Sequence, residues 1–115
     1  HTDPAHHTIM KQLAAIKARN AGEAFSLTTE TMHERYKSAG NFLGHMRFEF
    51  RSLYNHTEYK FLDQHQIKDG LVQKVEITPE TGEPVLAIFK LKKIDDSKWL
   101  IDSFTIIGRG DLQPI

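Results

Sequence analysis

The sequence of 115 residues contains no cysteine. Disulfide bonds, thiolate zinc sites, iron–sulfur clusters and cysteine nucleophiles are therefore excluded together. No apolar run reaches the roughly 18–20 residues of a membrane-spanning helix. The sequence also has no glycine-rich phosphate loop, no His–Glu–x–x–His zinc motif and no nucleophile elbow. We therefore expect no membrane partner and no cofactor.

A net charge is also missing, because fifteen basic and fifteen acidic side chains cancel. A nucleic-acid-binding protein usually carries a basic excess, since neutralised phosphates supply most of its affinity. We therefore expect no nucleic-acid partner. With 39% hydrophobic residues, a chain of this length can bury one core. We expect a single α+β domain over residues 1–115, with its core at about 4–107 and a loosely held tail at 108–115.

Apolar residues recur at helical spacing in the first half of the chain. Asp3-Pro4 is a typical N-cap followed by proline at the first helical position. A second, short helix is expected at 23–27. The capping box Thr31–x–x–Glu34 predicts the start of a third helix, and Asn41 is a candidate cap for a fourth. The apolar stripes of the first and fourth helices are Ile9, Leu13 and Ile16, and Phe42, Met46, Phe50 and Leu53.

After Asn55 the period of the apolar residues changes from about 3.6 to 2, which indicates strands. Asp69-Gly70 predicts a hairpin turn, because Asp-Gly suits turn positions that need positive φ. Short loops between strands predict an antiparallel meander. Helices followed by such a sheet predict an α+β fold. The expected strands are 58–68, 71–78, 85–93 and 99–107.

The last two expected strands are apolar on both faces, whereas a sheet face turned to water is polar at alternate positions. The helices of so short a chain can cover one face only. A second copy of the chain is the simplest cover for the other face, so we expect a homodimer through the sheet. The alternative is a sheet that curls and covers itself. In the expected strand 85–93, one face carries Val85, Ala87, Phe89 and Leu91 and the other carries Leu86 and Ile88. In the expected strand 99–107, one face carries Trp99, Ile101 and Ile107 and the other carries Leu100, Phe104 and Ile106.

The order of these elements resembles the nuclear-transport-factor-like (cystatin-like) α+β cone, in which a curved sheet wraps a long helix. More closely, the chain resembles a bacterial family catalogued as domain of unknown function 4864. The resemblance covers most of residues 8–107. It implies no activity, since the wider superfamily includes isomerases, dehydratases and non-catalytic binding modules. The similar stretches are Gln12-Leu13 through Ala24-Phe25, Asn41-Phe42 to Tyr54, Ala87–Leu91 and Lys98–Ile101.

Asp63 and His65 are the first candidates for catalysis. Residues two apart on a strand share a face, with roughly 6.5–7 Å between their Cα atoms. The carboxylate can then orient the imidazole as a general base. Asp102 is a second candidate, because a carboxylate buried among apolar residues has a raised pKa. Each has a simpler explanation: Asp63 and His65 are solvated, and Asp102 pairs with a lysine or arginine.

We expect a non-catalytic, dimeric module with a small pocket for an apolar ligand. The alternative is a small acid–base enzyme, an isomerase or a dehydratase, that uses Asp63 and His65 or Asp102 in the same pocket. The residues expected to line this pocket are Phe42, Met46, Phe50, Tyr59, Phe61 and Phe89.

A weaker alternative is metal binding by His1, His6 and His7. His6 and His7 are adjacent, so on a helix they point about 100° apart, and no ligand follows at i+4. We therefore assign no metal site. His33, His45 and His56 are isolated, and we expect them at helix surfaces or in loops. Because the sequence begins with histidine and the similar family often looks exported, a periplasmic or secreted location is expected, with a signal peptide removed.

Overall fold

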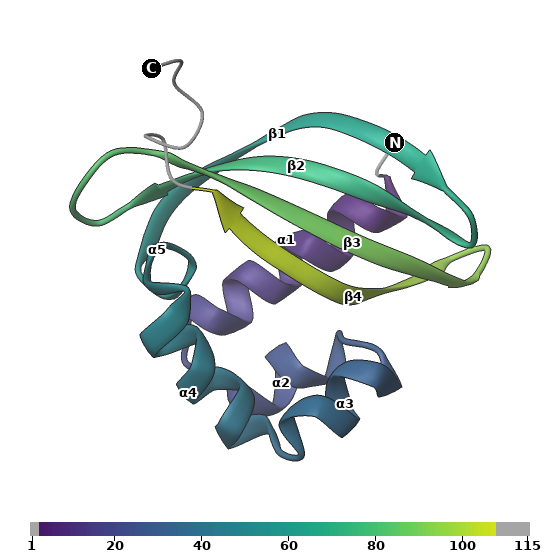
Figure 1. The fold of residues 1–115 in the computed structure, drawn as a ribbon, viewed down its shortest axis with the longest axis horizontal. Helices are drawn as coiled ribbons and strands as arrows, with labels where there is room; N and C mark the ends of the chain where they lie inside the picture. The colour runs from purple at the N-terminus through teal and green to yellow at the C-terminus, as the bar shows by residue number, and fades with distance from the viewer. Residues whose placement is uncertain (1–2, 108–115) are drawn as a thin grey trace.

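The computed structural model describes residues 3–107. Five helices come first and four strands follow (Figure 1). This confirms the expected α+β fold. The tail expected at 108–115 lies outside the described residues. The helices are α1 (Pro4–Lys17), α2 (Ala21–Ser26), α3 (Glu30–Tyr36), α4 (Ala39–Glu49) and α5 (Arg51–Tyr54), and the strands are β1 (His56–Ile67), β2 (Gly70–Pro79), β3 (Val85–Asp95) and β4 (Lys98–Ile107).

Helix α1 begins as the sequence predicted, but the caps of two later helices lie elsewhere. The Asp3 carboxylate accepts a hydrogen bond from the Ala5 N–H, at 2.9 Å. The N-cap of α3 is Thr29, so the predicted capping box at Thr31 is wrong. The N-cap of α4 is Ser38, whose hydroxyl accepts from the Asn41 N–H at 3.1 Å. Serine in an extended conformation fits this role, so the helix begins two residues before Asn41.

The predicted fourth helix is divided at Phe50. Residue 50 has φ −127° and ψ 54°, outside the helical region, and it caps both α4 and α5. The break turns the Phe50 ring toward the sheet, where its centroid lies 4.6 Å from that of Phe104. Phe42 and Met46 on α4 and Leu53 on α5 are all buried in the core.

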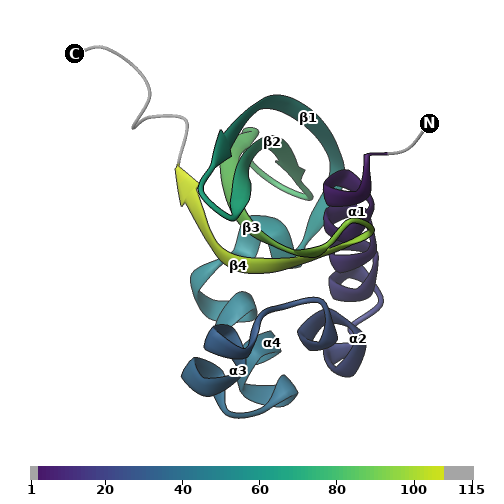
Figure 2. The ribbon, with the colours of Figure 1, turned by 90° about the vertical axis from the view of Figure 1, so that its right-hand side faces the viewer.

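The strands form one antiparallel sheet in the order β1-β2-β3-β4, as predicted. Figure 2 shows the sheet strongly curled, with the helices to the right of it and below it, so that they cover one face. We call the covered face the inner face and the opposite face the outer face. On β2 the inner residues are Leu71, Gln73, Val75 and Ile77, all buried.

The sheet has four register shifts, and two of them, the β-bulges in the middle of β1 and β4, decide which candidate residues point inward. In β1, Phe61 pairs with Val75 and Gln64 pairs with Gln73, so β1 has one extra residue. In β4, Ser103 pairs with Lys90 but Ile101 pairs with Leu91, so Asp102 is extra. Each bulge moves the following residues to the opposite face. The predicted alternation on β4 is therefore corrected: the residues packed in or against the core are Trp99, Ile101, Phe104 and Ile106.

Candidate functional site

Asp63 and His65 do not share a pocket with Tyr59 and Phe61. Both polar residues are exposed, whereas both aromatic residues pack against the core. The bulge between Phe61 and Gln64 separates them, because the residues after it alternate in the opposite sense. His65 pairs with Val72 of the outer face. The structure therefore does not bring Asp63 and His65 into the pocket that the acid–base hypothesis requires.

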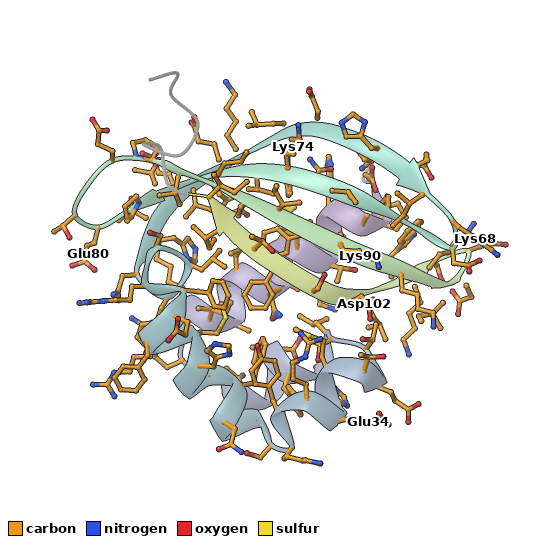
Figure 3. The ribbon with its side chains drawn as sticks, viewed as in Figure 1. Glu34, Lys68, Lys74, Glu80, Lys90 and Asp102 are labelled. Atoms are coloured by element: carbon orange, nitrogen blue, oxygen red, sulfur yellow. The ribbon has the colours of Figure 1, made fainter. Side chains whose placement is uncertain are left out.

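Asp102 is held in place by the helical half of the chain. Its carboxylate accepts a hydrogen bond from the Thr29 hydroxyl at 2.7 Å, and lies 4.0 Å from the Lys90 ammonium (Figure 3). The Thr29 N–H also donates to the Ile101 carbonyl at 3.0 Å. These contacts join the α2–α3 connection to the edge of β4. The arrangement fits the simpler explanation, in which Asp102 is a paired structural carboxylate.

The expected ligand-binding residues fall into two groups within the packed interior. Phe42, Phe50 and Phe89 surround Phe104, with ring centroids between 4.6 and 6.2 Å from it. Met46 is 1% exposed, in the same core cluster. The other group is Tyr59 and Phe61, whose ring centroids are 5.8 Å apart in an edge-to-face arrangement. Aromatic rings at these distances stabilise the core by contact with one another.

A polar network that the sequence analysis missed joins α1 to the bulge of β1. Gln73 is fully buried, and its side-chain amide donates to the carbonyls of Leu62 and Asp63, at 3.0 and 3.3 Å. Its Oε1 lies 2.7 Å from His6 Nε2 and accepts from Gln64 Nε2 at 3.0 Å. Gln73 thus satisfies carbonyls that the bulge removes from the ladder. A glutamine among Leu71, Val75 and Ile77 is the sequence signal that could have revealed it.

The N-terminal end of α1 belongs to the same network. The Asp3 carboxylate accepts from Gln64 Nε2 at 3.2 Å, and the His6 ring stacks on Phe61 with centroids 4.0 Å apart. Burial alone would raise the pKa of Asp3, but the hydrogen bonds from Gln64 and the Ala5 N–H and the nearby His6 lower it. His6 is therefore a packing residue in this structure.

The histidines expected at the surface have defined partners. His33 Nε2 lies 2.8 Å from the Phe25 carbonyl, and His45 Nδ1 lies 2.8 Å from the Tyr36 hydroxyl. Burial raises the pKa of the Tyr36 hydroxyl, although the Arg35 charge acts against it. His56 is 5% exposed at the start of β1, so its expected place at a helix surface or in a loop is wrong. Its Nδ1 lies 2.8 Å from the Leu53 carbonyl of α5.

His1, the first of the proposed metal ligands, lies outside the described residues. His6 is engaged with Gln73, and His7 is exposed. Within residues 3–107 no group of three or more histidine, aspartate or glutamate side chains is placed to hold a metal ion. No helix in this part of the chain is long and apolar enough to cross a membrane.

The buried His56 predicts a pH dependence of stability. Burial lowers the pKa of its imidazole below the ordinary value of about 6.5, assisted by the charges of Lys17 and Arg19, while its hydrogen bond to the Leu53 carbonyl opposes this. As the pH falls below about 6.5, the unfolded chain binds a proton that the folded chain does not. We therefore expect the free energy of unfolding to decrease as the pH falls from 7 to 5, measured by urea titration.

The variant His56→Gln should reduce this slope, because it removes the group that protonates only on unfolding. His65→Gln is the matched control: residue 65 is an exposed histidine, so its replacement should leave the slope as in the parent chain. Equal slopes in all three proteins would contradict the assignment to His56.

A hollow of about 370 Å³ lies on the outer face, beside the bulge of β1. Leu62, Pro84, Val85 and Leu86 supply its apolar wall. Asp63, Lys74 and Glu76 also line it. The hollow could hold a small apolar molecule, and it lies on the face opposite to the interior pocket that the sequence analysis expected.

Comparison with curated proteins and with solved structures gives no significant match. Comparison with protein families matches residues 2–113, almost the whole chain. The matched family is the one expected from the order of helices and strands. The chain therefore belongs to the family described as "Domain of unknown function (DUF4864)".

Proposed function

We propose that this protein is a non-catalytic module that forms a homodimer through the outer face of its sheet. The observation that carries the proposal is an apolar patch on that face, over β2, β3 and β4, which no helix covers. Leu86 pairs directly with Ile107, and Ile88 is the next outer residue of β3. Val72 of β2 pairs with Lys90 and so lies diagonal to Ile88. Each of these apolar residues is half-buried within the single chain, so a second surface can remove the rest of their area from water.

The charges around the patch favour a second copy over a charged partner. Opposite charges alternate on this face, as in the directly paired Lys60 and Glu76. A twofold interface places the same patch of two copies face to face. A surface that carries positive and negative charges in equal number can pair with itself in this way. Laid flat, a four-stranded sheet of this length has roughly 600 Å² on a side, which is an upper limit for the contact of this curled sheet and compares with ~800 Å² per partner in a standard interface. The basic residues around the patch are Lys60, Lys74, Lys90 and Lys92, and the acidic residues are Glu58, Asp63, Glu76 and Asp102.

The hollow beside Leu62 and Leu86 lies at the edge of the same patch. In a dimer built on this face, a second copy would shield its apolar wall from water. We therefore assign the small apolar ligand of this module to that hollow. The exposed positions of Asp63 and His65 and the paired state of Asp102 support the non-catalytic assignment.

Native mass spectrometry and sedimentation equilibrium test the proposal together. The parent chain should have twice the monomer mass, and a bound small molecule should add a constant mass. Ile88→Lys places an ammonium at the centre of the patch and should produce a folded monomer, because burying an unpaired charge is strongly unfavourable.

Phe48→Lys is the control. Phe48 is 74% exposed on α4, away from the sheet, so the same charge there should leave the dimer intact. A monomeric parent chain, or a dimer that Ile88→Lys does not weaken, would show that this face is not the interface.

A further inference from the structure

A second hollow, of about 380 Å³, lies on a different surface from the dimer patch. It is lined by the start of α1, the end of α2 with the next residue, and the β3–β4 turn with the start of β4. Figure 2 shows this turn beside α1. The volume of the hollow falls at the lower end of the ~300–1,000 Å³ range of small-molecule sites. It goes beyond the proposed function, since Leu100 is its one lining residue on the outer face and pairs with Lys92, at the other end of the strands from the Leu86–Ile107 pair.

This hollow is basic in a chain that has no net charge. His7, Lys11 and Lys98 line it, and no carboxylate does. The hollow on the other side of Trp99 differs, because Asp3 and Asp96 line it together with Lys93. The positive charge is therefore gathered on one side of the tryptophan, where it favours an anion.

The cationic groups are largely free to meet a ligand. Within residues 3–107, the side chains of His7 and Lys11 make no hydrogen bond or ion pair. Lys98 begins β4 and pairs with Asp95 at the end of β3. The pKa of Asp95 is lowered first by the hydrogen bond from the Ser97 N–H and to a smaller extent by the Lys98 charge. One ammonium is therefore unpaired, and the other faces a solvated carboxylate.

Trp99 gives the hollow a fixed apolar wall. The indole is half-buried and packs against the core, and the Thr8 hydroxyl donates to the Trp99 carbonyl at 2.9 Å. Leu27 and Leu100 extend the apolar surface beside it. A flat apolar group can stack on an indole held in this way, and an anionic group on the same molecule can reach the lysines.

We infer that this hollow binds a small organic anion, a carboxylate or a phosphate ester with a flat apolar group. The charge lies between Lys11 and Lys98, and the apolar group lies against Trp99. Because both lysines are exposed, each should contribute only roughly two- to fivefold to affinity. The inference is independent of dimerisation, since none of these residues lies in the patch around Ile88.

Trp99 is the only tryptophan of the chain, so it gives one indole N–H signal in a ¹⁵N–¹H spectrum. Phenylacetate and phenyl phosphate should each move this signal saturably, and their relative affinities separate a carboxylate site from a phosphate site. Phenylacetamide has nearly the same shape without the charge, so it should bind at least about fivefold more weakly. Probe concentrations up to about 20 mM detect any dissociation constant in the millimolar range.

Lys11→Gln and Lys98→Gln should each weaken phenylacetate roughly two- to fivefold. Lys17→Gln removes the same charge from the same helix, but residue 17 does not line the hollow, so affinity should not change. The remaining amide signals show whether each variant is folded. The inference is wrong if the indole signal does not saturate with either anion, if phenylacetamide binds as well as phenylacetate, or if Lys17→Gln weakens binding as much as the other variants.

Discussion

Replacing Gly70 with alanine should destabilise the fold by about 3 kcal/mol or more, because the new methyl group has no space. A Cβ on residue 70 would lie 2.0 Å from the Leu91 carbonyl oxygen and 3.1 Å from its carbon. Both are backbone atoms of the neighbouring strand, so no side chain can rotate away. Strands β2 and β3 would have to separate at the pair Gly70 and Lys92, which weakens the ladder beside the first hairpin.

Gly44→Ala is the matched control, and its expected effect has the opposite sign. Gly44 lies within α4, and a Cβ there would meet nothing within 4 Å. Alanine in the interior of a helix is favoured over glycine by up to about 1 kcal/mol. Urea unfolding of the three proteins measures both effects, provided that the m-values agree. A loss below about 1 kcal/mol in Gly70→Ala would contradict the close approach of the two strands.

This glycine illustrates a correct prediction made for an incomplete reason. Asp-Gly indicated a hairpin, and the hairpin is present. Positive φ was the expected requirement, yet Asp69 carries it, with φ 63°, and Gly70 begins β2 with an ordinary φ. The glycine is needed because another strand approaches it closely, and a local sequence pattern contains no information about that neighbour.

The order and type of the elements could be predicted because they follow from local patterns. Periodic Ile9, Leu13 and Ile16, the cap at Asp3 and the change of period after Asn55 are all visible in the sequence. Which residues of β1 and β4 point inward was harder to predict. A bulge adds one residue and leaves no composition signal here, because β4 is apolar on both sides of Asp102.

The candidate sites were therefore harder to predict than the fold. Asp63 and His65 would share a face with Tyr59 and Phe61 only in a strand without a bulge. The hollow beside Trp99 joins residues from α1, the α2–α3 connection and the β3–β4 turn, which are distant in sequence. The nuclear-transport-factor-like superfamily stays a prediction, whereas the narrower family is established by the match over residues 2–113.

Replacing Gln73 with leucine should cost at least about 3 kcal/mol, although leucine has a similar size and greater hydrophobicity. The side chain is fully buried, and its amide donates to the carbonyls of Leu62, Asp63 and Lys74. Leucine would leave these carbonyls without that donor, together with the facing groups of His6 and Gln64. Each buried polar group left unpaired costs about 1–3 kcal/mol. Urea unfolding measures the loss, and faster hydrogen exchange should appear first in β1 around residues 62–64.

Gln12→Leu separates the effect of the network from that of burying a glutamine. Gln12 is 2% exposed on α1, and its Oε1 is buried with no hydrogen-bond partner among the described residues. Leucine there removes an unsatisfied polar atom, so the change should be neutral or stabilising by up to about 1 kcal/mol. The two substitutions are chemically identical and both sites are buried, so a difference of this size would come mainly from the partners of each amide. If Gln73→Leu were as well tolerated as Gln12→Leu, the bulge of β1 would not depend on Gln73, and its carbonyls would have to find water or new partners instead.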